Sequence, residues 1–291
     1  MRKSKYLVMS SFYFKFDKNL SKIIEINELF KKQNIIDLER FIKITNIKFD
    51  FEFYNLNFIY LPKYIKSIQI YTSDNNQIIL LDLSNCINLK NIKTHDIFEN
   101  RIKILKLSNN ISSLDKTSVF LNRIEVLILS NCTKLKYIEE EAFINNDIKH
   151  LRLPKSIETI NDEAFKNNEI KILDLSNCYN LNVIMGWAFK SNQIKELKLP
   201  QNIKMINIGA FESNQIEILD LSNCTQLKEI DKNVFLDNPL KEIKILGDIK
   251  IEYDSYYNKD IWSEFTIYYN ENNKKAGDYI YINNKWQWYP L

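Results

Sequence analysis

The chain has 291 residues, of which 45% are hydrophobic, and its 40 basic and 37 acidic side chains leave a net charge of +3. This near balance argues against a nucleic-acid-binding protein, because such proteins usually present a strongly basic face to the phosphate backbone. No apolar run approaches the roughly 18 residues of a transmembrane helix, so we expect no membrane-spanning segment.

Residues 1–55 show no repeat, and we expect them to form an N-terminal cap that covers the first repeat. Residues 6–16 are strand-like, and residues 20–32 fit a short amphipathic helix. Phe49, Phe51 and Phe53 alternate with acidic residues, as in a half-buried strand. A small functional domain of its own is the alternative for this segment.

A regular repeat begins at Leu56 and extends to residue 250. Each copy contains a Leu-x-Leu core, which we expect to form a short strand with both leucines on one side. Identical strands at fixed spacing stack in parallel, ~4.8 Å apart, and bury their leucines as a continuous ladder. The first residues of these cores are separated by 24 and 22 residues in alternation, at Leu81, Leu105, Leu127, Leu151, Leu173, Leu197, Leu219 and Ile243.

An aromatic residue recurs once per copy after the strand. Residues 161–165 of one copy look like a capped helical turn, and the Asn167-Asn168 pair after them suits a left-handed exit. We therefore expect short helical turns on the side opposite the strands, with one ring per copy inside. These rings are Phe98, Phe120, Phe143, Phe165, Phe189, Phe211 and Phe235.

Residues 251–291 differ from the repeats because they are rich in tyrosine and tryptophan. Residues 260–270 fit a helix, and residues 279–282 and 286–289 flank an asparagine pair that favours a hairpin. We expect a C-terminal cap whose rings cover the last repeat. The alternative is an aromatic platform that binds carbohydrate or a protein partner.

The pattern Ile170-x-x-Leu173-x-Leu175-x-x-Cys178-x-x-Leu181 matches the leucine-rich repeat. Together with the Leu-Pro-x-x-Ile-x-x-Ile and Ala-Phe elements, it resembles the BspA-like (Treponema-type) subclass over residues 56–250. The resemblance implies an α/β repeat solenoid with a parallel β-sheet on its concave face, short helical turns on its convex side and a cap at each end.

The same resemblance implies adhesion or host-protein binding, and with it a place on the cell surface. Residues 1–19 favour a cytoplasmic or host-intracellular location instead, because the basic start and short apolar run meet charged residues with no small-residue cleavage site.

The sequence carries no recognisable catalytic motif. Cys86, Cys132, Cys178 and Cys224 are spaced 46 residues apart, which places them too far from one another for a disulfide or a zinc site. The two histidines, His95 and His150, fall in different copies. There is also no glycine-rich phosphate loop or serine elbow. We therefore expect a non-enzymatic protein without cofactor or metal.

The outward residues of the strands are the remaining candidates for function. The middle residues of the Leu-x-Leu cores alternate between acid and base, with Ile128 the one break. This pattern predicts either a self-neutralising ladder or the charged part of a binding groove. Aliphatic residues dominate two positions earlier. The candidate partner-binding residues on the concave face are Leu80, Asp82, Ile104, Lys106, Val126, Ile128, His150, Arg152, Ile172 and Asp174.

These observations favour non-catalytic protein–protein recognition through the concave face. Two alternatives stay open: a structural component that self-associates or assembles into a larger complex, and carbohydrate binding by the aromatic C-terminal segment.

Overall fold

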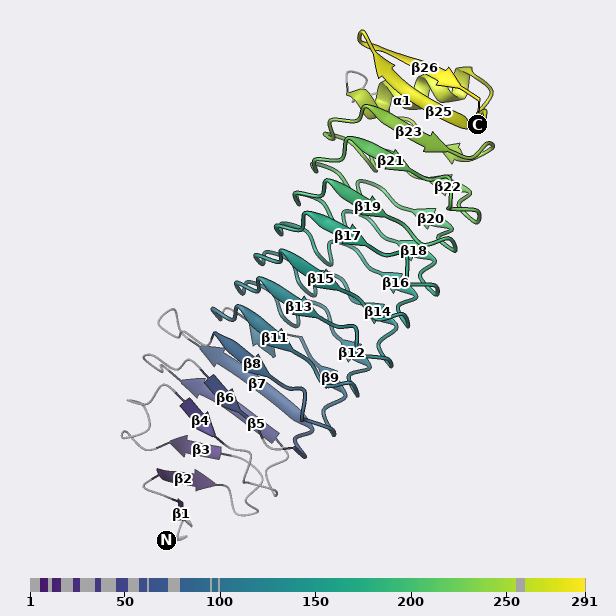
Figure 1. The fold of residues 1–291 in the computed structure, drawn as a ribbon. Helices are drawn as coiled ribbons and strands as arrows, with labels where there is room; N and C mark the ends of the chain where they lie inside the picture. Colours follow the sequence, from purple (N-terminus) through teal and green to yellow (C-terminus); the bar gives the residue numbers. More distant parts are fainter. Residues whose placement is uncertain are drawn as a thin grey trace.

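The chain forms an elongated stack of turns in the computed structural model, with little curvature in the view of Figure 1. The last turns end in a C-terminal cap that contains the one helix found among the described residues. The residues that the structure describes are 6–9, 12–16, 23–26, 35–37, 46–51, 58–61, 63–72, 79–94, 96–98, 100–254 and 260–290.

The first strands form an antiparallel sheet of their own, in the order β1 (Tyr6–Met9), β2 (Phe12–Phe16) and β3 (Ile23–Ile26). The strand-like reading of residues 6–16 is therefore confirmed for β1 and β2. The helix expected over residues 20–32 is wrong for Ile23–Ile26, because these residues form β3. Its three isoleucines are β-branched residues, which favour a strand over a helix.

The Leu-x-Leu cores form parallel strands along one side of the stack (Figure 1). The predicted register is observed: Leu81 pairs with Leu105, and Leu127 pairs with both Leu105 and Leu151. We call the outward side of the strands from β8 to β23 the strand face. The strands are β4 (Ile35–Asp37), β6 (Phe58–Tyr60), β8 (Leu80–Asp82), β11 (Ile104–Lys106), β13 (Val126–Ile128), β15 (His150–Arg152), β17 (Ile172–Asp174), β19 (Glu196–Lys198), β21 (Ile218–Asp220) and β23 (Glu242–Ile245).

Parallel stacking already begins at β4, which pairs with β6 although it lies within the first 55 residues. Further along, the ladder is interrupted between β15 and β17 and again between β19 and β21. Leu153-Pro154 follows β15, and Leu199-Pro200 follows β19. Proline has no N–H to donate to a neighbouring strand. Leu61-Pro62 also follows β6, yet β6 pairs with β8 without a break, so proline alone does not account for the interruptions.

Short parallel strands also run along a second side of the stack (Figure 1). The sequence did not predict this sheet, because each of its later strands is only two residues long. In each of these two-residue strands one residue is buried, as Ile184 is in β18. The strands are β5 (Asn46–Phe51), β7 (Ser67–Thr72), β9 (Asn91–Ile92), β10 (Ile97–Phe98), β12 (Ser113–Leu114), β14 (Tyr137–Ile138), β16 (Thr159–Ile160), β18 (Val183–Ile184), β20 (Met205–Ile206), β22 (Glu229–Ile230) and β24 (Lys250–Ile251).

The turns that carry the Ala-Phe elements differ from the expected helical turns. Glu163 and Asn167 have φ of 54° and 56°, which lie in the left-handed region and cannot continue a right-handed helix. The N–H of Ala164 still donates to the carbonyl of Asn161 within the turn, but the N–H of Phe165 donates to the carbonyl of Ala188 in the next copy. The turns therefore stack through hydrogen bonds between copies.

The phenylalanines of these turns form a continuous stack inside the molecule. Successive rings lie 5.3–5.5 Å apart between centroids and within 7° of parallel. All of them are buried. An offset stack of this kind adds to the free energy gained by burying the rings. The rings of this phenylalanine stack are those of Phe143, Phe165, Phe189, Phe211 and Phe235.

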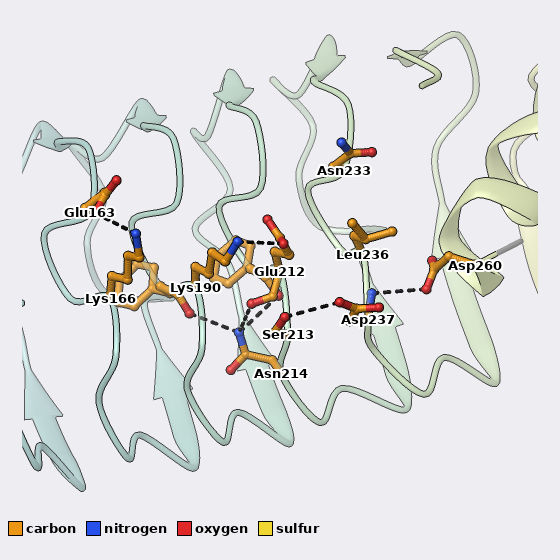
Figure 2. Close-up of polar contacts among 12 residues, drawn as sticks. Glu163, Lys166, Lys190, Glu212, Ser213, Asn214, Asn233, Leu236, Asp237 and Asp260 are labelled. Carbon is orange, nitrogen blue, oxygen red and sulfur yellow. Dashed lines mark hydrogen bonds and ion pairs between the residues drawn. The ribbon is translucent and has the colours of Figure 1, made fainter. Parts of the chain in front are cut away.

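A row of buried asparagines lies beside the phenylalanine stack. Asn214 is representative: its Nδ2 donates to the carbonyls of Phe189 and Phe211, at 3.0 Å each (Figure 2). Its Oδ1 accepts from the N–H of Ile194 at 3.0 Å. The Nδ2 groups from Asn122 to Asn238 in this row donate in the same way to backbone carbonyls of two neighbouring copies. The buried asparagines are Asn100, Asn122, Asn146, Asn168, Asn192, Asn214 and Asn238.

The C-terminal cap comprises α1 (Ile261–Glu271), β25 (Gly277–Ile282) and β26 (Lys285–Tyr289). The predicted helix and hairpin are thus both confirmed. Asp260 caps α1 by accepting from the N–H of Trp262 at 2.7 Å. The hairpin turns on Asn283 and Asn284, both of which have positive φ, as a type I′ turn requires. β25 pairs antiparallel with β23 and so covers the last strand of the stack.

Candidate functional site

The structure places all ten predicted site residues on the outward side of strands β8 to β17. In β11, β13 and β17 a buried leucine stands between two outward residues that are half-buried or exposed. Pairing brings Ile104 beside Leu80 and Val126, and it brings Ile128 beside Lys106 and Arg152. These residues therefore share one surface. Their role in binding stays a prediction.

The N-terminal end of the strand face is neutralised by its own charges. Lys106 Nζ lies 3.2 Å from Asp82 Oδ2, and the Ser84 N–H donates to Asp82 Oδ1 at 3.0 Å. Partial burial pushes the pKa of Asp82 upward, but the hydrogen bonds from Ser84 and Lys106 outweigh it and lower the pKa. Asp82 is therefore a carboxylate that already has its partners.

The same arrangement recurs on β17, around Asp174. The Ser176 hydroxyl donates to Asp174 Oδ1 at 2.5 Å, and Lys198 Nζ lies 3.9 Å from Asp174 Oδ2. The Ser176 hydroxyl and N–H and the Lys198 charge lower the pKa of Asp174. Exposed pairs of this kind stabilise by less than about 1 kcal/mol, so they affect the surface potential more than the fold.

The middle of the face is apolar and carries a cation without a partner. The side chain of Ile128 is 42% exposed and that of Ile172 is 58% exposed, which is unusual for isoleucine. Arg152 lies beside Ile128 in the register, on the strand that precedes Ile172. Among the described residues, no acidic group pairs with the Arg152 guanidinium.

This middle region coincides with the interruption between β15 and β17. Leu151 and Leu153 are only partly buried there, whereas Leu105 and Leu107 of the equivalent strand β11 are buried. These two leucines are therefore less completely buried where the ladder is interrupted. We call Ile128, His150, Arg152 and Ile172 together the central patch.

The residues just before the strands form a charged rim that the sequence analysis missed. Most of them are ion-paired: Glu125 contacts Lys103 at 3.0 Å and Lys149 at 3.4 Å. Lys171 and Lys195 are exposed and have no acidic partner among the described residues. The signal was available, since these positions repeat at the same 24- and 22-residue spacing. They are Lys103, Glu125, Lys149, Lys171, Lys195, Glu217 and Lys241.

The aromatic C-terminal segment presents few of its rings to solvent. Trp262, Phe265 and Tyr279 are buried, and the Trp262 ring meets the last ring of the phenylalanine stack, Phe235, edge-on at 4.9 Å. Trp288 is partly exposed, with Lys275 Nζ 4.7 Å from its ring centroid. The crowding of aromatic residues is therefore mostly core packing of the cap.

The cysteines are buried along the stack as thiols and not as disulfides. Burial raises the pKa of Cys132 and of Cys178 to about 11, so neither is a thiolate near neutral pH. The described part of the chain holds no group of three or more His, Cys, Asp or Glu side chains placed to bind a metal ion. None of its helices combines the length and the apolar character needed to cross a membrane. His95 lies outside the described residues.

The repeats match the family described as "BspA type Leucine rich repeat region (6 copies)" over residues 42–171 and 160–286. The chain belongs to this family of leucine-rich repeat proteins, as the repeat pattern predicted. No curated protein matches the chain.

Among solved structures, a leucine-rich repeat protein from Bacteroides ovatus is 16% identical, with a TM-score of 0.51 over 86% of this chain and 66% of that protein. This likeness supports the fold. The pneumococcal vaccine antigen PcpA is 14% identical over 87% of this chain and 51% of its own, with a TM-score of 0.39. A leucine rich cell surface protein from Faecalibacterium prausnitzii is 13% identical over 87% and 96%, with a TM-score of 0.30. The last two likenesses are too distant to support an inference. The chain spans 66% and 51% of the first two proteins.

Proposed function

We propose that this chain is a non-catalytic recognition protein that binds a protein partner through the strand face. The observation that carries the proposal is the exposure of Ile128 and Ile172 on either side of Arg152. Aliphatic side chains on an otherwise charged sheet surface are typical of a contact site, and arginine is enriched among residues that dominate binding energy.

The rest of the face supports the same reading. Asp82 and Asp174 are held by serine and lysine within the chain, so both ends of the site are already neutralised. Rim charges of this kind contribute to partner choice and association rate more than to affinity. The central patch then remains available for a partner, and Ile218 on β21 is a further exposed isoleucine of the same face, at 55%.

The proposal is tested by replacing the two exposed isoleucines together. An Ile128→Ser/Ile172→Ser variant and the wild type are each used to capture proteins from the native cell or its host, with identification by mass spectrometry. We expect a defined set of captured proteins to be lost with the variant. Circular dichroism checks that the variant keeps its fold.

A matched control uses the second side of the stack. Tyr137 and Met205 are 44% and 37% exposed on strands β14 and β20. A Tyr137→Ser/Met205→Ser variant should capture the same proteins as the wild type. Capture that is unchanged by the strand-face variant, or lost only with the control variant, would contradict the proposed site.

A further inference from the structure

We infer that the central patch recognises an acidic, aliphatic segment of a partner protein. The inference rests on the proposed function and adds the chemistry of the ligand. The acidic character of the ligand is inferred from the charged side chains on and just before strands β15, β17 and β19. Some of these charges are already paired with other residues of the chain, and the others are not.

The cations of these three strands fall into two groups. Lys149 contacts Glu125 at 3.4 Å and Glu169 at 3.6 Å, and Lys198 contacts Asp174 at 3.9 Å. These lysines have partners within the chain. Arg152, Lys171 and Lys195 are exposed and have no acidic partner in the described part of the chain. The uncompensated charge of the region is therefore mostly positive.

One carboxylate opposes this excess. Glu196 is exposed on β19, beside Ile172 in the register, and it too has no ion pair among the described residues. Three uncompensated cations therefore face a single uncompensated carboxylate. The lysines of the rim lie in a row along the stack. The N–H of Lys195 donates to the carbonyl of Lys171, so these two lysines occupy successive copies.

The geometry combines this charge with apolar surface. A guanidinium presents a planar set of donors that binds a carboxylate through two parallel hydrogen bonds. Ile128 and Ile172 lie on the neighbouring strands. Aliphatic side chains of a bound partner would cover these two isoleucines and remove them from water. A carboxylate next to aliphatic residues would satisfy the guanidinium and the isoleucines together.

A polyanion such as nucleic acid or a sulfated sugar fits less well. Asp174 and Glu196 stand on the same strands and would repel a uniformly charged chain. The exposed isoleucines would also stay hydrated against phosphate or sulfate groups. A peptide segment with mixed character satisfies both parts of the surface.

The test uses a displayed library of random 12-residue peptides selected on the full chain. We expect the enriched peptides to contain Asp or Glu together with Leu, Ile or Val. Synthetic copies should bind at least about tenfold more weakly to an Arg152→Glu variant, the size of effect that a close charge pair produces. Binding to Lys204→Glu, an exposed charge reversal next to strand β20 on the second side, should stay within about twofold.

The other outcomes separate the two proposals. Peptides that require Ile128 and Ile172 but are not acidic, or that bind Arg152→Glu unchanged, would overturn the acidic ligand and leave the recognition site intact. A selection in which no peptide depends on the isoleucines or on Arg152 would count against both. If a fluorescent heparin fragment binds the chain in a way that requires Arg152 but not the isoleucines, the ligand of the patch would be a polyanion and not a peptide.

Discussion

Asn168 donates a hydrogen bond from Nδ2 to the carbonyl oxygen of Phe143, 25 residues earlier, at 3.0 Å. The same Nδ2 donates to the carbonyl of Phe165 at 3.0 Å, and Oδ1 accepts from the N–H of Ile148 at 3.0 Å. One buried amide therefore satisfies donors and acceptors of two neighbouring copies, and its removal would leave several backbone groups without partners.

We expect Asn168→Asp to lower the free energy of unfolding by at least about 3 kcal/mol, because the new carboxylate oxygen faces carbonyl oxygens instead of donating to them. The measurement is urea unfolding followed by circular dichroism. Asn167→Asp is the control, because Asn167 is exposed and aspartate tolerates its φ of 56°. A similar loss for both variants would show that the buried hydrogen bonds do not decide the effect.

A second prediction concerns the phenylalanine stack. The ring of Phe165 lies between those of Phe143 and Phe189, at 5.4 and 5.3 Å. Phe165→Ala should cost about 3–5 kcal/mol of unfolding free energy, because the cavity lies inside a continuous stack. Tyr179→Ala removes a ring that is 54% exposed and should cost less than about 1 kcal/mol. Equal losses in urea unfolding would mean that the stack is not the core.

The repeat itself could be predicted from the sequence because one physical requirement recurs at every copy. Leu81, Leu105 and Leu127 must all point inward from strands that pair in register, so the spacing alone identifies them. The cap elements α1, β25 and β26 were also predictable, since the asparagine pair at Asn283 and Asn284 defines the hairpin.

Other features were not predictable from the pattern. The turn around Glu163 reads as helical because its residues suit a helix start, but the N–H groups of Glu163 and Phe165 donate to carbonyls of the next copy. β3 lies in a segment whose apolar spacing also fits a helix. Lys171 and Lys195 have no ion pair among the described residues because no carboxylate lies close enough to them. The sequence pattern does not contain these distances between side chains.

A third prediction concerns the cap. The indole N–H of Trp262 is buried without a hydrogen-bond partner, although the ring packs against Phe235. Trp262→Phe removes the unsatisfied donor while keeping a ring, so its cost should stay within about 1.5 kcal/mol. Trp262→Ala should cost about 3–5 kcal/mol. Thermal unfolding of both variants distinguishes these values. A Phe variant as unstable as the Ala variant would mean that the indole shape itself is required.

The pH dependence of stability gives a fourth prediction, centred on Asp96. Burial raises the pKa of this carboxyl to about 6, although the N–H of Lys93 donates to Oδ2 at 2.7 Å and the Lys93 charge also lowers the pKa. The charge of Asp115 raises it further. Because the folded chain holds this proton more tightly than the unfolded chain, stability should fall as the pH rises from about 4 to about 6.

Asp96→Asn keeps the accepting oxygen and removes the charge. The variant should therefore be more stable than the wild type above pH 6, and the difference should disappear below about pH 4, where Asp96 is protonated in both states. Asp82→Asn should behave in the opposite way: its pKa is lowered in the folded chain, so its substitution should reduce stability at pH 7 and have less effect as the pH falls. Urea midpoints measured from pH 3 to pH 8 compare the two variants. An Asp96→Asn variant that is less stable than the wild type at pH 7 would show that the charged form of Asp96 is the one that the fold favours.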